Sequence, residues 1–232
     1  MATSARLLDN AMKNLGKEVE LKDLGEPTYI LGIEVKHDKL RKTLTINQRK
    51  YVDEILKSFN MEDSKQVKTP IEVGRSATTE ETSENISDPN VPYKNLIGNL
   101  MYLVQGTHPD IAFAANFLSQ FNSNYTQHHW RMAKRILRYL KGTRNAGITY
   151  TACKEPLVGF SDASRNEYNT GRSRSAYVYT LSKGAISWRS AKQQLVALST
   201  CEAEYIALTE AMKEGKWLKT RLTELGFDQY GT

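Results

Sequence analysis

The sequence predicts an α+β fold, in which a mainly helical segment is followed by a short antiparallel sheet and one helix. Three observations favour this class. Apolar residues recur at helical spacing in several stretches between residues 47 and 142. After residue 156 the pattern changes to short runs rich in Val, Tyr and Ile. A serine followed three residues later by a glutamate, at Ser199 and Glu202, then indicates the start of a last helix.

A β-hairpin and a helix are predicted in residues 1–72. The run Tyr29–Val35 is typical of a strand, and residues 44–46 form a second short strand after a polar turn. Asn47 can cap a helix that ends near Asn60. This helix has one apolar face, formed by Tyr51, Ile55, Leu56 and Phe59.

Residues 73–92 are predicted to be a linker. Gly, Ser, Thr and Pro dominate this stretch and the residues just before it, and apolar periodicity is almost absent. Such a composition is typical of a flexible connection or a long surface loop.

Three helices are predicted in residues 93–150. They cover about Tyr93–Val104, Pro109–Phe121 and Thr126–Gly142. Proline suits the first turn of the second helix, and the threonine caps the third. The third helix has an apolar stripe formed by Trp130, Ala133, Leu137 and Leu140.

The third helix also carries a basic face. No acidic residue occurs between Trp130 and Lys154, so the charges on this face repel each other unless an anion lies nearby. We therefore predict that this face contacts nucleic-acid phosphates. The predicted contacts are Arg131, Lys134, Arg135, Arg138, Lys141 and Arg144. A solvated helix face is the alternative interpretation.

Residues 151–232 are predicted to form three strands and a helix. The strands cover residues 157–162, 176–181 and 185–189, and a tight turn at Ser182–Gly184 joins the last two into a hairpin. The helix begins at Ser199 and ends before Gly226, and Gly215 is a candidate break within it.

Two acidic residues of this segment are candidate metal ligands. Glu202 has a structural role as the partner of Ser199 in a capping box. Glu204 lies elsewhere on the helix, among apolar neighbours, where a carboxylate needs a partner such as a cation. Asp162 ends an apolar strand, and a strand-end Asp and a first-turn Glu can converge on Mg²⁺, which prefers oxygen ligands. An aspartate that simply ends its strand in a turn is the alternative.

Charge and composition restrict the function classes. The 232 residues contain 32 Lys and Arg against 26 Asp and Glu, a net charge of +6, which favours a nucleic-acid partner or serves solubility alone. Cys153 and Cys201 are far apart and are expected to be reduced thiols. There is no membrane-length apolar run and no signal-peptide pattern. We therefore expect a cytoplasmic or nuclear protein without a membrane partner.

Several collinear motifs closely resemble the Pol polyprotein of copia-type retrotransposons. Its ribonuclease H domain is matched by Phe160–Ala163, Arg172–Val178, Ile186–Gln194 and Val196–Leu208. Its reverse transcriptase, from late palm through thumb and connection, is matched by Lys22–Gly25, Leu31–Glu34, Thr69–Pro70, Tyr93–Tyr102, Pro109–Ala112 and Leu137–Thr143.

The resemblance implies a division of the chain and a chemistry. Residues 1–72 correspond to a late palm hairpin and thumb helix, 93–150 to a helical connection, and 151–232 to a truncated ribonuclease H-like domain. In that family four acids hold two Mg²⁺ ions that cut the RNA strand of an RNA/DNA hybrid. Asp162 matches the first acid and Glu204 the second.

Departures from the family pattern lower the expected activity. The third and fourth acids are expected after Thr232, and Ser164 stands where the family usually has a second Asp. Tyr51–Glu54 is similar in its letters to the catalytic Asp-Asp motif of the reverse transcriptase. It lies in an amphipathic helix, however, so we do not expect it to have that catalytic role. We predict nucleic-acid binding without polymerase activity and with little or no hybrid cleavage, unless the remainder of Pol or another copy supplies the missing acids.

Two other functions remain open. Arg135–Arg138 spells the RxLR pattern of secreted oomycete effectors, although it lies in mid-helix, far from the N-terminus. A relic without function is the third possibility.

Overall fold

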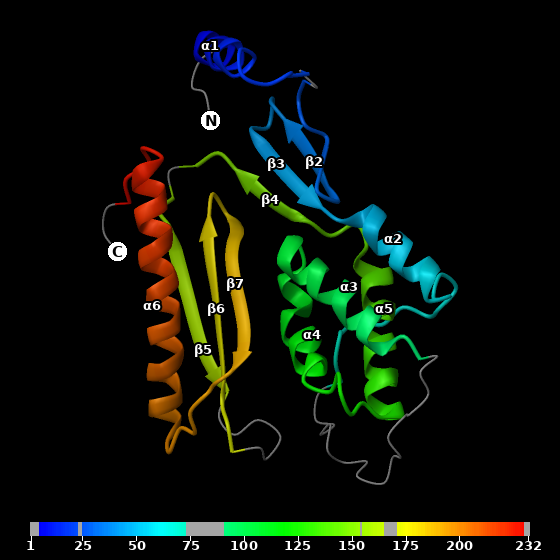
Figure 1. Cartoon of the computed structure of the whole chain (residues 1–232). Coiled ribbons are helices and arrows are strands. Elements are labelled where there is room, and N and C mark those ends of the chain that lie inside the picture. Colours follow the sequence, from blue (N-terminus) through cyan, green and yellow to red (C-terminus); the bar gives the residue numbers. More distant parts are fainter. Residues whose placement is uncertain (1–4, 23–24, 73–90, 154, 165–170, 230–232) are drawn as a thin grey trace.

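The computed structural model describes residues 5–22, 25–72, 91–153, 155–164 and 171–229, and this part of the chain has an α+β fold (Figure 1). Its strands form two antiparallel sheets, one of four strands and one of three. Most of the predicted linker, residues 73–90, lies outside the described residues. The predicted fold class is confirmed at the level of α+β.

The N-terminal sheet begins with the predicted hairpin. A helix that the sequence pattern did not indicate, α1 (Ala5–Leu15), precedes it. Strands β2 (Ile33–Asp38) and β3 (Thr43–Asn47) then pair antiparallel. The prediction of one continuous strand over Tyr29–Val35 is wrong. Leu31 and Gly32 have φ values of 48° and 74°, so the chain turns there and β1 (Tyr29–Ile30) folds back onto β2.

The fourth strand of this sheet, β4 (Ile148–Thr151), comes from the far side of the helical segment. It pairs with β3, with Ile148 opposite Ile46, and was not predicted. A Cβ on Gly147 would lie 2.5 Å from the carbonyl oxygen of Ile46, so only glycine permits this close approach. Strand β4 therefore lies across the division at residue 150 that the sequence suggested.

The helices between β3 and β4 enclose the main hydrophobic core. They are α2 (Arg49–Ser58), α3 (Tyr93–Gly106), the 3₁₀ turn η1 (Pro109–Ile111), α4 (Ala112–Ser119) and α5 (Gln127–Thr143). These elements confirm the predicted helices. The fully buried side chains at their centre include Tyr93, Leu96, Leu100, Leu103, Ile111, Ile136, Leu137 and Leu140.

The starts of α2 and α5 differ in how they are capped. Gln48, rather than the predicted Asn47, is the N-cap of α2, and Asn47 Oδ1 accepts a hydrogen bond from the backbone N–H of Arg49 instead. At α5 the predicted cap Thr126 is confirmed. There Nδ1 of His129 accepts a hydrogen bond of 3.0 Å from the backbone N–H of Thr126, completing a capping box.

The C-terminal sheet consists of β5 (Val158–Ser164), β6 (Arg174–Leu181) and β7 (Gly184–Lys192), in that order. The predicted hairpin is confirmed. Ser182 and Lys183 both have positive φ, which matches the tight two-residue turn between paired antiparallel strands. Strand β5 is an edge of this sheet, and most of its residues are exposed.

Helix α6 (Thr200–Glu224) covers one face of this sheet and runs without interruption through Gly215 (Figure 1). The proposed break at Gly215 is therefore wrong. The hydroxyl of Tyr179 on β6 donates a hydrogen bond of 2.6 Å to the carbonyl oxygen of Ala211. A Cβ on residue 215 would lie 2.5 Å from that hydroxyl, so Gly215 makes room for a side chain of the sheet.

Candidate nucleic-acid and metal site

The two predicted acidic ligands lie on elements that pack against each other. Asp162 is near the C-terminal end of β5, and Glu204 is near the N-terminal end of α6. These two ends lie at the same end of the sheet (Figure 1). Leu208, one helical turn after Glu204, lines a groove of about 650 Å³ together with Phe160 and Ser161 of β5. Glu204 therefore projects from a helix surface that borders the edge strand.

Strand geometry fixes the face from which Asp162 projects. Side chains alternate between the two faces of a strand. Gly159 of β5 is opposite Tyr179, which reaches α6, so Gly159 and Ser161 face that helix. Asp162 consequently projects from the other face, towards α4. The structure records no contact between Asp162 and Glu204, and a shared ion would have to lie at the open edge of β5.

The donor chemistry of this pair suits a hard cation. Both side chains are exposed carboxylates, which are the ligands that Mg²⁺ prefers, with water completing its shell. Among the described residues, no group of three or more His, Cys, Asp or Glu side chains is arranged to hold a metal ion. Asp162 and Glu204 are thus fewer protein ligands than a two-metal centre needs.

The glutamate in the first turn of α6, Glu202, has the structural role that the sequence predicted, with one difference. Oγ of Ser199 accepts a hydrogen bond of 3.0 Å from the backbone N–H of Glu202. The Glu202 carboxylate accepts one of 2.7 Å from the backbone N–H of Leu198, rather than from that of Ser199. Glu202 is thus occupied by the helix cap.

The basic face of α5 holds the segment that follows α2. Nε of Arg138 donates a hydrogen bond of 2.7 Å to the carbonyl oxygen of Lys65, and Nζ of Lys141 donates one of 2.8 Å to that of Ser64. Arg135 forms an ion pair of 2.8 Å with Glu72. These three side chains therefore have partners within the chain, and they contribute to folding as well as to any contact with phosphate.

The remaining basic residues of this face differ in their surroundings. Nζ of Lys134 lies 5.5 Å from the ring centre of Trp130, a cation–π contact. Arg144 forms a longer ion pair of 3.4 Å with Asp53. Arg131 is exposed. Asp53 also pairs with Arg49, which supports its assignment as a surface residue of α2 rather than a polymerase acid.

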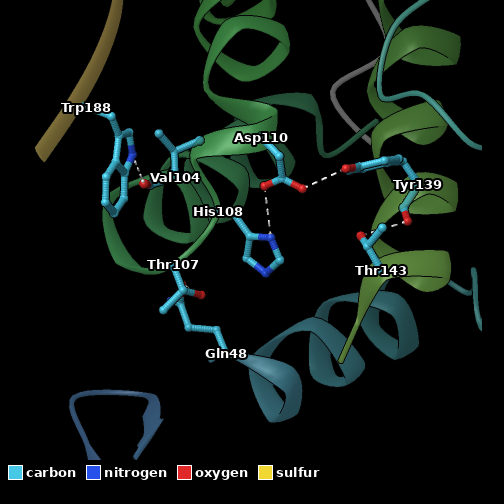
Figure 2. Close-up of polar contacts among 8 residues, drawn as sticks. All are labelled: Gln48, Val104, Thr107, His108, Asp110, Tyr139, Thr143 and Trp188. Carbon is cyan, nitrogen blue, oxygen red and sulfur yellow. Dashed lines mark hydrogen bonds and ion pairs between the residues drawn. The ribbon is translucent and has the colours of Figure 1, made fainter. Parts of the chain in front are cut away.

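A polar network that sequence reasoning missed lies where η1, α3 and α5 meet (Figure 2). Tyr139 donates a hydrogen bond of 2.8 Å to one Asp110 oxygen, and Nδ1 of the buried His108 lies 3.3 Å from the other. Burial acts to raise the pKa of Asp110, but the hydrogen bonds with His108 and Tyr139 outweigh it and lower that pKa. Burial and Asp110 together raise the pKa of Tyr139 to about 12. The network joins helices and carries no sequence signature.

Comparison with known proteins places the chain among transposon polyproteins. It is 39% identical over 221 residues to the retrovirus-related Pol polyprotein from transposon TNT 1-94 of Nicotiana tabacum, covering 93% of this chain and 17% of that protein. It is 37% identical over 222 residues to that from transposon RE1 of Arabidopsis thaliana, covering 95% of this chain and 15% of that protein. The chain thus spans about a sixth of the length of these polyproteins.

A further relative has a different name. The chain is 47% identical over 134 residues to the secreted RxLR effector protein 161 of Plasmopara viticola, covering 57% of this chain and 94% of that protein. No protein-family model matches the chain, and no solved structure matches it. Within the described residues, no helix is long and apolar enough to span a membrane.

The matches that cover almost the whole chain define its class as a segment of a transposon polyprotein. The chain belongs to the copia-type retrotransposon Pol family.

Proposed function

We propose that this chain is a reverse transcriptase and ribonuclease H segment of Pol that binds RNA/DNA hybrid or other nucleic acid. The observation that carries the proposal is the placement of Asp162 and Glu204 at the same end of a three-stranded sheet and its covering helix, in a chain of the Pol family. Mg²⁺ at these carboxylates would bring positive charge to the backbone of a bound nucleic acid.

The basic face of α5 is the proposed phosphate-binding surface. Of its six residues, Arg131 and Lys134 are the proposed direct contacts, because Arg131 is exposed and Lys134, among the described residues, has a cation–π contact with Trp130 and no ion pair. Arg135, Arg138, Lys141 and Arg144 each have a hydrogen bond or an ion pair within the chain, so their substitution would disturb folding as well as binding.

These 232 residues are proposed to bind a hybrid without cutting it efficiently. They contribute Asp162 and Glu204, whereas two-metal cleavage needs enough carboxylates to fix both ions. Further acids from the remainder of Pol or from another copy would complete the site.

Binding and cleavage can be tested together. The affinity for a fluorescein-labelled RNA/DNA hybrid is measured by anisotropy, and cleavage is measured with a fluorogenic hybrid in Mg²⁺ or Mn²⁺. We expect Arg131→Gln with Lys134→Gln to weaken binding several-fold and to flatten its salt dependence. Lys57→Gln with Lys94→Gln removes the same charge from other helices and should change binding less. Equal effects of the two pairs would contradict the proposed surface.

The cleavage arm tests the acids separately. We expect little cleavage by the unaltered chain, and Mn²⁺ binding that Asp162→Asn or Glu204→Gln weakens. Efficient cleavage that Asp162→Asn abolishes would show that these residues suffice for catalysis and would overturn the proposal of an incomplete site.

The effector-like alternative rests on the relative from Plasmopara viticola. The structure places the RxLR tetrapeptide inside α5, where Ile136 and Leu137 are fully buried and Arg138 is bonded to Lys65. A receptor could bind the side chains of this tetrapeptide only after α5 had unpacked from the hydrophobic core. A secretion assay separates the alternatives: secretion of the unaltered chain that is lost in Arg135→Ala with Arg138→Ala, while circular dichroism shows that the variant still folds, would favour the effector.

A further inference from the structure

A hollow of about 640 Å³ lies between α4 and the face of the C-terminal sheet opposite α6. This volume is in the range that accommodates small organic ligands. The hollow lies between the helical core and the sheet, the kind of junction at which ligand sites concentrate. Its lining combines aromatic side chains with a few polar groups.

Aromatic rings of three elements contribute to the apolar walls: Phe113 of α4, Phe160 of β5 and Trp188 of β7, with Tyr177 of β6 also in the lining. Trp188 is held in place, because its Nε1 donates a hydrogen bond of 2.8 Å to the carbonyl oxygen of Val104 (Figure 2). Its only donor is therefore satisfied inside the protein, and what the ring offers the hollow is apolar surface. Phe160 is 59% exposed, so a ligand that covers it gains apolar contact.

The polar groups of the hollow differ in what they can still bind. Both oxygens of Asp110 are engaged by His108 and Tyr139. The guanidinium of Arg174 lies 5.2 Å from the Phe113 ring centre and donates a hydrogen bond to Asn116. The side-chain carboxylate of Asp162, in contrast, has no hydrogen bond or ion pair with another residue that the structure describes; Asp162 is held by its backbone, in the pairing of β5 with β6. Its carboxylate can therefore accept hydrogen bonds from a ligand, as can the smaller hydroxyl groups of Ser164 and Ser190 in the same lining.

We propose that this hollow binds an unpaired guanine base. A carboxylate offers two acceptor oxygens side by side, and guanine presents two adjacent donors, N1–H and the N2 amino group, on one edge. Adenine and cytosine pair one amino donor with an acceptor nitrogen, which a carboxylate oxygen would repel. Uracil has one N–H between two carbonyl groups. The planar base would stack against the aromatic walls while its edge reaches Asp162.

This inference rests on the proposed function in one respect: it takes nucleic acid to be the molecule that supplies the guanine base. It also assigns Asp162 a second ligand, because the same carboxylate is the proposed Mg²⁺ ligand. Guanine and Mg²⁺ should therefore compete, and added Mg²⁺ should weaken guanine binding. Titrations are accordingly made first without a divalent cation.

Trp188 provides a reporter inside the hollow. In a chain carrying Trp130→Phe and Trp217→Phe, Trp188 is the remaining tryptophan. We expect guanosine monophosphate to quench its fluorescence saturably, and the adenosine, cytidine and uridine monophosphates to bind at least about five-fold more weakly. Asp162→Asn should remove this preference, whereas Asp63→Asn, the same change at an exposed site elsewhere, should retain it.

Equilibrium dialysis of the unaltered chain with labelled guanosine monophosphate provides a measurement that does not depend on the tryptophan substitutions. Absence of saturable binding, equal binding of all four nucleotides, or a preference that survives Asp162→Asn would each overturn the inference. Hybrid anisotropy is measured in parallel. Hybrid binding without guanine binding removes only this inference, whereas guanine binding without hybrid binding removes only the proposed function.

Discussion

The hydroxyl of Tyr139 on α5 donates a hydrogen bond of 2.8 Å to Oδ2 of Asp110 in η1. Because His108 engages the other oxygen of the same carboxylate, this aspartate joins two turns of the helical core through its side chain. We expect Tyr139→Phe to lower the free energy of unfolding by about 1 kcal/mol, since it leaves the Asp110 carboxylate one donor short. Denaturant unfolding measures the change. Tyr205→Phe, at an exposed hydroxyl on α6, is the control and should change stability by less than about 0.5 kcal/mol.

His129 should make the chain less stable in weak acid. Burial, with a smaller contribution from His128, lowers the pKa of His129 from 6.5 to about 4. The unfolded chain therefore binds this proton more tightly, so the stabilisation is complete above pH 6.5 and is lost as the pH falls towards 4. The two pKa values correspond to a loss of up to about 3 kcal/mol.

The variant His129→Gln tests this assignment. Glutamine is a usual partner in a capping box but does not titrate, so it should keep the cap at Thr126 while losing the ring contact with Phe121. Unfolding free energies measured from pH 4 to pH 7 should vary less in this variant. An unchanged pH dependence would show that another group is responsible.

Gly215→Ala should destabilise the chain, although alanine is the better helix former. The added Cβ would lie 2.5 Å from the Tyr179 hydroxyl, and we expect a cost of about 1–3 kcal/mol. Gly98→Ala in α3 is the matched control, because its Cβ would have no neighbour within 4 Å, and it should stabilise by about 0.5–1 kcal/mol. In a Tyr179→Phe background the cost of Gly215→Ala should fall, which a double-mutant cycle measures.

The glutamates Glu202 and Glu204, near the start of α6, should separate into a structural and a ligand-binding residue. Glu202→Ala removes the acceptor of the Leu198 N–H and should cost about 0.5–1 kcal/mol, comparable to Ser199→Ala. Glu204→Ala should leave stability within about 0.5 kcal/mol and weaken Mn²⁺ binding. Thermal unfolding and Mn²⁺ titration distinguish the two. A stronger loss of Mn²⁺ binding in Glu202→Ala would reverse the assignment.

Periodicity and capping signals were sufficient to predict most helices and both principal hairpins. These features depend on residues close in sequence, such as Ser199 with Glu202 or the turn at Ser182. Strand β4 could not be found in this way. It is four residues long, and its partner β3 lies about a hundred residues earlier, so no local pattern specifies the pairing.

The candidate site was only partly predictable for the same reason. The resemblance selected Asp162 and Glu204, but the sheet face that Asp162 occupies follows from the pairing of β5 with β6. The role of Arg138 and Lys141 was also hidden, because their partners are backbone carbonyl groups of Lys65 and Ser64, which every residue type carries. Counting charges indicated a basic face but could not show which of its side chains already hold the fold together.

Strand β4 couples parts of the chain that sequence motifs treat as separate. On one side of β4, the hydroxyl groups of Thr149 and Thr45 of β3 form a hydrogen bond. On the other side, the backbone N–H of Thr151 donates a hydrogen bond to the carbonyl oxygen of Ser182. The Tyr150 hydroxyl donates one to the carbonyl oxygen of Ala185. Residues 151–232 expressed alone would lack Thr149 and Tyr150, and with them two of these three hydrogen bonds. Unfolding should consequently be cooperative across both sheets, and a chain cut at residue 150 should not reproduce the behaviour of the C-terminal sheet in the whole protein.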